Sequence, residues 1–113
     1  GTGGICAGVY MGQVSGLWQI AVVWILGGML GVYAAGSTSG GHLNPAVSFS
    51  FALLRPDDFS WGDLVPYWCA QLVGSIIAGL INIIIFNQSI MSFEKDKDLV
   101  RGSAEGIASA VGF

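Results

Sequence analysis

Two long stretches without a charged residue constrain the fold of this chain more than any other feature. They are Leu17–Ala35 and Leu64–Phe86, and no Asp, Glu, Lys or Arg precedes Arg55. A helix of about 20 apolar residues crosses the roughly 30 Å hydrocarbon core of a membrane. Each stretch is therefore expected to form a transmembrane helix, and Pro66 is tolerated because it falls in the first turn of the second one.

The composition agrees with a membrane location. Of the 113 residues, 53% are apolar and 10% are charged, whereas a soluble domain carries about 25% charged residues. Seven acidic residues against four basic ones exclude the basic surface of a nucleic-acid-binding protein. Trp18 and Trp68 lie near the ends of the two stretches, where aromatic rings favour the membrane interface. The chain is expected to be an integral, multi-pass membrane protein.

Residues that could support catalysis or metal binding are few. Cys6 and Cys69 suit neither a disulfide scaffold nor a CxxC metal site, and both are expected to act as small buried hydrophobes. His42 is the single histidine, too few for a zinc site that needs three or four protein ligands. Since no acidic residue lies near His42 in the sequence, a catalytic triad is not expected either. The sequence predicts no enzyme, no cofactor and no metal.

The segment between the two stretches, GSTSGGHLNPAVSFSFALL, does not look like a simple connection. Asn44 is a favoured helix N-cap and Pro45 a favoured first helical residue. A helix over Asn44–Leu54 would be about 16 Å long, half the thickness of a bilayer. Ser37–Leu43 is rich in Gly and Ser and is expected to be non-helical, and it could reach from the surface to the midplane if extended. The sequence thus predicts a half-helix that begins inside the membrane.

Such a half-helix has consequences for function. Irregular backbone at membrane depth is tolerated only where protein or a water-filled path satisfies it, which predicts a polar pathway or binding site. The positive potential at a helix N-terminus opposes cations and protons but not neutral solutes. The Asn44 amide offers a donor, and a row of carbonyls offers acceptors. These are the carbonyls of Gly40, Gly41, His42 and Leu43. Donors and acceptors together suit a small neutral molecule with hydroxyl groups.

The run from Gly40 to Val47, GGHLNPAV, resembles the first Asn-Pro-Ala box of the aquaporin and glycerol-facilitator (major intrinsic protein) family, with Asn44, Pro45 and Ala46 as the box. The resemblance implies an all-α membrane protein, a right-handed bundle with an inverted repeat of six transmembrane helices and two half-helices. This chain would supply about half of it, two full transmembrane helices and one half-helix, as a piece of a longer protein. The implied division is 1–16 (end of helix 1 and connection), 17–36 (helix 2), 37–54 (loop and half-helix), 64–86 (helix 3) and 87–113 (following loop).

One face of the first stretch carries a single bulky residue among small ones. Trp24, Gly28, Gly31 and Ala35 recur at i, i+4, i+7 and i+11. Packing of small residues against another helix would explain the pattern. The resemblance implies that Trp24 is a selectivity-filter residue, at the position where glycerol facilitators have Trp and water-selective members have Phe. It implies that Gly28 is a small residue of the pore wall.

On the second stretch Gln71, Ser75 and Asn82 share one helix face. Polar side chains inside a membrane find partners on neighbouring helices, so structural hydrogen bonding is favoured over direct pore lining. Gln71 could also hold the loop that carries Asn44.

The expected function is a passive channel for glycerol and water that excludes ions and protons. The resemblance implies a homotetramer, and the expected location is the plasma membrane, in contact with lipid and without nucleic acid. A water-selective channel is the first alternative. A secondary transporter with broken helices is another, although it would need an ionisable residue inside the membrane, and the two stretches contain none. A truncated product that does not conduct is the last.

Overall fold

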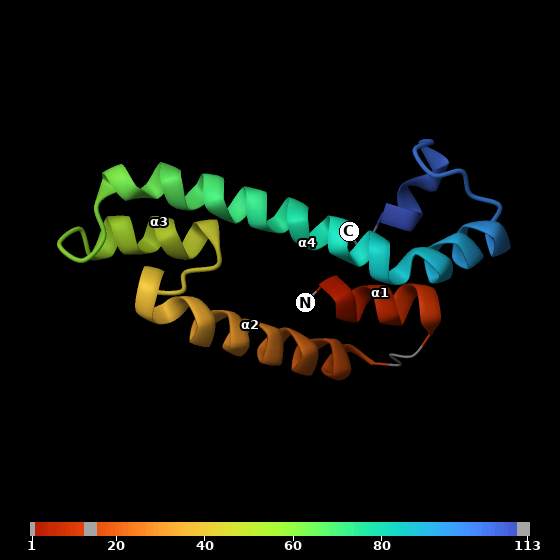
Figure 1. Cartoon of the computed structure of the whole chain (residues 1–113), viewed down its shortest axis with the longest axis horizontal. Helices are drawn as coiled ribbons and strands as arrows, with labels where there is room; N and C mark the ends of the chain where they lie inside the picture. The colour runs from red at the N-terminus through yellow and green to blue at the C-terminus, as the bar shows by residue number, and fades with distance from the viewer. Residues whose placement is uncertain (1, 13–15, 111–113) are drawn as a thin grey trace. The chain divides into compact units, whose positions relative to one another are not determined.

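The structure, a computed structural model, describes residues 2–12 and 16–110 and is helical throughout its regular elements. Helix α1 is Thr2–Met11, α2 is Leu17–Ser39, α3 is Pro45–Leu54 and α4 is Trp61–Asp96, and a short 3-10 helix, η1, spans Glu105–Ala110 (Figure 1). The chain divides into two compact units. We call residues 26–76 the central unit, and residues 1–25 with 77–113 the terminal unit.

Helices α2 and α4 are both long and apolar enough to cross a membrane. α2 has 23 residues and α4 has 36. At 1.5 Å per residue α4 is about 54 Å long, well beyond the roughly 30 Å of hydrocarbon. α2, which the structure describes over its full length, contains no buried residue, so its apolar side chains are available to lipid or to further helices.

The predicted end of the second transmembrane helix was wrong. A loop was expected from residue 87, but α4 continues to Asp96. Polar and charged residues after Phe86 mark the end of the apolar stretch, not the end of the helix. Ile90 is fully buried and Phe93 packs edge-on against Tyr10 of α1, with ring centroids 5.5 Å apart. These contacts within the terminal unit hold the extra helical turns.

The start of the expected loop before Asn44 was also wrong. α2 was expected to end at residue 36 and residues 37–43 to be non-helical, but the helix runs to Ser39. The Ser39 hydroxyl donates to the Ala35 carbonyl one turn back (3.1 Å), so the serine is satisfied within the helix. The helix ends only at Gly40, whose φ of +75° ends regular α geometry.

The two cysteines differ in their surroundings. Cys6 is fully buried in the terminal unit, as expected, but Cys69 is exposed. Cys69 belongs to a face of α4 whose neighbours Val65, Leu72 and Val73 are all more than half exposed, a face that suits lipid. Among the described residues no three His, Cys, Asp or Glu side chains gather as metal ligands would.

In the terminal unit, the segment after α4 folds back onto that helix. The Arg101 guanidinium donates two hydrogen bonds to the Glu94 carboxylate, from Nε to Oε1 (2.8 Å) and from Nη2 to Oε2 (2.9 Å). Glu94 lies about two helical turns beyond Phe86, outside the apolar stretch. The hydrogen bonds from Arg101 hold the pKa of Glu94 below its ordinary value. The Tyr10 hydroxyl donates to the Ser109 carbonyl (2.6 Å) and ties α1 to the same segment.

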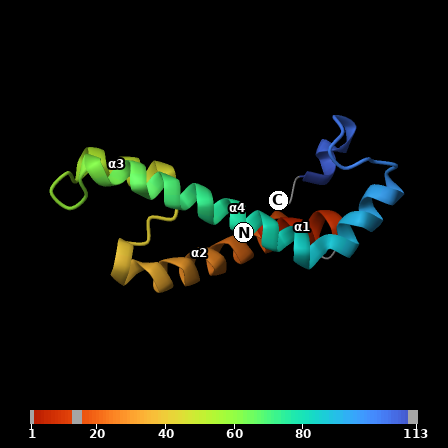
Figure 2. The ribbon, with the colours of Figure 1, turned by 45° about the horizontal axis from the view of Figure 1, so that its top comes forward.

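In the central unit α3 lies along the first turns of α4, as two views show (Figures 1 and 2). The small core between them consists of Ala52, Phe59 and Leu64, with Phe51 and Tyr67 packed against it. The break between α2 and α3 lies beside this core. The central unit therefore contains the whole Gly40–Val47 run that the sequence singles out.

Candidate functional site

The break between α2 and α3 contains three residues with positive φ. Gly40, Gly41 and Leu43 have φ of +75°, +62° and +51°. A Cβ added to Gly41 would lie 3.2 Å from the Cα of Val32 and 3.4 Å from that of Gly36. These are backbone atoms of α2, so only glycine allows the chain to pass this close to the helix. The turn is thus fixed by both its dihedral angles and its contact with α2.

Leu43 is the one non-glycine residue with positive φ in this turn. A conformation of this kind is costly for a branched side chain and persists only when its surroundings hold it. Its Cδ1 lies 2.8 Å from the point where a Cβ on Gly31 would be. The missing side chain at Gly31, part of the small-residue face of α2, therefore makes the room that Leu43 occupies.

Asn44 caps α3. Its backbone is extended (φ −149°, ψ 131°), and its Oδ1 accepts a hydrogen bond from the Ala46 amide at 2.8 Å. Pro45 follows as the first helical residue, where its missing N–H costs nothing. Because the cap uses the side-chain oxygen, the NH2 group of the exposed Asn44 side chain is left to act as a donor.

Ser48 is the centre of a hydrogen-bond network behind the cap. Its side chain is fully buried. Its hydroxyl donates to the Asn44 carbonyl (3.3 Å) and accepts from Gln71 Nε2 (2.9 Å), while His42 Nδ1 lies 3.2 Å from the same oxygen. A hydroxyl has only one proton to donate, and Ser48 donates it to the Asn44 carbonyl. The contact between His42 Nδ1 and the Ser48 oxygen is therefore a hydrogen bond only if Nδ1 is the donor. The network links the loop, α3 and α4 at one atom.

The His42 ring lies among three aromatic rings. Its centroid is 4.5 Å from that of Phe51, 4.8 Å from Phe59 and 5.3 Å from Tyr67. This packing holds the imidazole as a structural side chain of the loop. The Nδ1 atom of the ring lies 3.2 Å from Ser48 Oγ.

Two further donors on α4 reach the backbone on either side of the break. The Tyr67 hydroxyl donates to the Ser39 carbonyl at the end of α2 (2.9 Å), and the Trp68 indole donates to the Pro45 carbonyl at the start of α3 (3.0 Å). Trp68 was expected from the sequence only as an interface residue. No local signal predicts these bonds, since the paired residues are 28 and 23 positions apart.

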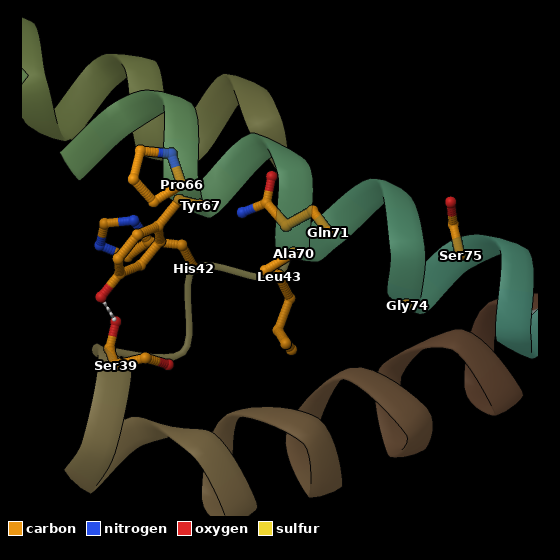
Figure 3. Close-up of a pocket in the computed structure, with 9 residues that line it drawn as sticks. All are labelled: Ser39, His42, Leu43, Pro66, Tyr67, Ala70, Gln71, Gly74 and Ser75. Carbon is orange, nitrogen blue, oxygen red and sulfur yellow. Dashed lines mark hydrogen bonds between the residues drawn. The ribbon is translucent and has the colours of Figure 1, made fainter. Parts of the chain in front are cut away.

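A cavity of about 650 Å³ opens beside the break (Figure 3). Residues of α4, the loop and the end of α2 line it. They are Ser39, His42, Leu43, Pro66, Tyr67, Ala70, Gln71, Gly74 and Ser75. The buried Gln71 Oε1 has no hydrogen-bond partner among the residues that the structure describes. Gln71 is linked to the Asn44 segment through Ser48, to which its Nε2 donates. Its Oε1 is an acceptor at the cavity.

The sequence-predicted site residues fall in both units. Asn44, Pro45, Ala46 and the row from Gly40 to Leu43 lie together in the central unit, and of that row His42 and Leu43 line the cavity while Gly41 is buried. Gly28, also in the central unit, has open space around its Cα, with nothing within 4 Å of an added Cβ. Trp24 belongs to the terminal unit and is 52% exposed.

Comparison with known proteins gives one consistent answer. The "Glycerol uptake facilitator protein" of Pseudomonas aeruginosa is 34% identical over 110 residues, 97% of this chain and 39% of its own length. The "Propanediol uptake facilitator PduF" of Salmonella typhimurium is 36% identical over 97% of this chain and 41% of its own length. The "Aquaglycerol porin AQY3" of Saccharomyces cerevisiae is 40% identical over 81% of this chain and 14% of its own length.

The chain spans about two fifths of the length of the two bacterial relatives. No solved structure matches it significantly. Residues 3–112, nearly the whole chain, match the sequence profile described as "Major intrinsic protein". The match includes both membrane-spanning helices and the break between them. On this evidence, the chain belongs to the major intrinsic protein family.

Proposed function

We propose that the protein is a membrane channel for small neutral solutes that passes glycerol and water and excludes ions and protons. The family is one of membrane facilitators without enzymatic activity. Relatives at 34 and 36% identity are named for the uptake of glycerol and propanediol, both small neutral alcohols. These names support a solute of this class over a charged one.

The observation that carries the proposal is the geometry of Asn44 at the start of α3. Its Oδ1 is engaged with the Ala46 amide, which directs the donor end of the amide away from the helix. The first turn of a helix also carries about half a positive charge. A hydroxyl oxygen can accept from the Asn44 NH2 group, whereas a cation meets a repulsive potential there.

Other residues complete the proposed path. The carbonyls of Gly40, Gly41, His42 and Leu43 would accept from the hydroxyl groups of the solute. Gly28, open on its helix face, would widen the pore wall. Trp24, with about half of its surface exposed, would give the carbon skeleton of an alcohol an apolar surface in the filter.

The assembly is part of the same proposal. The exposed apolar side chains of α2 and α4 need lipid or protein around them. We propose a homotetramer in the plasma membrane, on the ground of the family resemblance, with the rest of the pore supplied by sequence that this chain does not contain.

The test is transport by the protein as its gene encodes it, purified into proteoliposomes, with glycerol and water permeability measured by light scattering. In Asn44→Asp the carboxylate still caps α3 but offers no donor. Glycerol permeability should fall about fivefold or more, the effect of one lost hydrogen bond. Asn87→Asp, at an exposed position of α4, makes the same chemical change as a control.

The possible outcomes separate the candidates. Glycerol and water permeation that Asn44→Asp reduces and Asn87→Asp does not would support the proposal. Water permeation without glycerol permeation in the unchanged protein would favour the water-selective alternative. Permeation of neither solute above that of empty liposomes would refute the channel.

A further inference from the structure

Three side chains in the first part of α4 donate hydrogen bonds to the segment that carries Asn44. The Tyr67 hydroxyl donates to Ser39 O (2.9 Å), Trp68 Nε1 to Pro45 O (3.0 Å) and Gln71 Nε2 to Ser48 Oγ (2.9 Å). We propose that this donor clamp, and Trp68 above all, fixes the orientation of the Asn44 amide and thereby sets the preference between solutes. The inference rests on the proposed channel function.

The clamp adds hydrogen bonds at both ends of the segment that the contacts with α2 and the His42 ring packing already position. Between Ser39 and Pro45 the chain contains two glycines with positive φ, and glycine reaches many backbone conformations at similar cost. Fixing the Ser39 carbonyl at one end and the Pro45 carbonyl at the other restricts the four residues and the cap between them. Asn44 is the residue next to the second fixed point.

Trp68 donates its hydrogen bond to Pro45, a residue that has no backbone donor of its own. Pro45 has no N–H, so its carbonyl is the only backbone group through which it can be anchored. In a helix that carbonyl accepts from the amide four residues on, and its second lone pair remains. The Trp68 indole uses this lone pair from a different helix, and so ties the first turn of α3 to α4.

Packing alone does not account for Trp68. The residue is 39% exposed, whereas the core beside it consists of Ala52, Phe59 and Leu64. An indole N–H in apolar surroundings needs an acceptor, and here that acceptor is a backbone atom of the Asn-Pro-Ala turn. Trp68 is therefore a positioning residue, since it acts on the solute through Asn44.

The experiment compares Trp68→Phe with Trp18→Phe in the protein as its gene encodes it. Both variants replace an indole by a phenyl ring, but Trp18 is 69% exposed, belongs to the terminal unit and makes none of the three clamp bonds. Two quantities are measured on folded, reconstituted protein. One is the ratio of glycerol to water permeability, and the other is the hydrogen-exchange rate of the Ala46 amide, which the Asn44 cap protects.

For Trp68→Phe we expect exchange at Ala46 to become about fivefold faster, as for one lost hydrogen bond, and the permeability ratio to change at least threefold. Trp18→Phe should change neither. A purely structural role would lower both permeabilities in proportion to the folded protein and leave their ratio unchanged. Should Trp68→Phe not fold, Tyr67→Phe removes one donor and keeps the ring against Phe59, with the same two readouts expected to shift.

The outcomes distinguish this inference from the proposed function. If a folded clamp variant changes neither hydrogen exchange at Ala46 nor the glycerol-to-water permeability ratio, the clamp proposal is overturned. Faster exchange with an unchanged ratio overturns its role in solute preference. If the unchanged protein passes neither solute, the proposed function fails by itself, and the exchange rate at Ala46 still decides whether the clamp holds the cap.

Discussion

Gly41→Ala tests whether the break between α2 and α3 is fixed by contact as well as by conformation. The φ of Gly41 is +62°, and an L-residue in the left-handed region costs about 1–2 kcal/mol. The new Cβ would also meet the Cα of Val32 at 3.2 Å and that of Gly36 at 3.4 Å. Neither backbone atom can withdraw without bending α2, and overpacking of this kind costs roughly 1–3 kcal/mol. Together the two costs predict a loss in the free energy of unfolding of about 2–5 kcal/mol.

Gly12→Ala provides the matched control. Gly12 has φ +61°, nearly the same as Gly41, but nothing lies within 4 Å of an added Cβ. It should therefore show only the conformational cost, about 1–2 kcal/mol. The difference between the two variants isolates the close approach of Gly41 to α2.

The assay is reversible unfolding in mixed micelles with a rising fraction of denaturing detergent, followed by the helical circular dichroism signal. A loss for Gly41→Ala that exceeds the loss for Gly12→Ala by at least 1 kcal/mol, on the order of the overpacking cost, is the expected result. Equal losses for the two variants would refute the reasoning, because the chain would then not pass close to α2 at Gly41.

Three further predictions follow from particular contacts. Ser48→Ala should lower the free energy of unfolding by about 1–3 kcal/mol because it leaves buried polar groups unpaired. Ser50→Ala, at an exposed serine of the same helix, should change it little. Equal effects of the two variants on unfolding in mixed micelles would contradict the buried network. The lowered pKa of Glu94 means that its ion pair with Arg101 stabilises the folded state above the ordinary carboxyl pKa and is lost as pH falls through the lowered value. Proteolysis of the segment after α4 should accelerate only in acid, and Glu94→Gln should remove this dependence on pH. Trp24→Phe should lower the glycerol-to-water permeability ratio in light scattering, and an unchanged ratio would exclude Trp24 from the filter.

The start of α3 could be predicted from the sequence because its causes are local. Asn44 accepts from an amide two residues away, and Pro45 adopts the backbone angle that a first helical residue needs. Both effects depend only on neighbouring residues. The apolar lengths of the two long helices are likewise a property of continuous sequence, and the family profile agrees with the resulting fold.

The ends of α2 and α4 could not be predicted in the same way. At the end of α2 the Ser39 carbonyl accepts a hydrogen bond from the Tyr67 hydroxyl of α4. In the turns after Phe86, Ile90 is fully buried and Phe93 packs against Tyr10 of α1. Polarity in a sequence marks where a helix leaves the apolar region of a membrane. It does not mark where the helix ends, since tertiary contacts supply the missing stabilisation.

In the Asn-Pro-Ala turn, the helix cap depends on local residues, whereas the orientation of the turn depends on residues far away in the sequence. The cap at Asn44 forms from residues within the turn itself, so the loss of a clamp bond should make it open more often without abolishing it. The orientation of the turn depends on Tyr67, Trp68 and Gln71, which are at least 23 positions from the atoms they bind. Substitutions on α4 could therefore alter how the Asn44 amide meets a solute while the capped helix stays intact. On this argument, solute preference can change through a helix that contributes none of the three Asn-Pro-Ala residues.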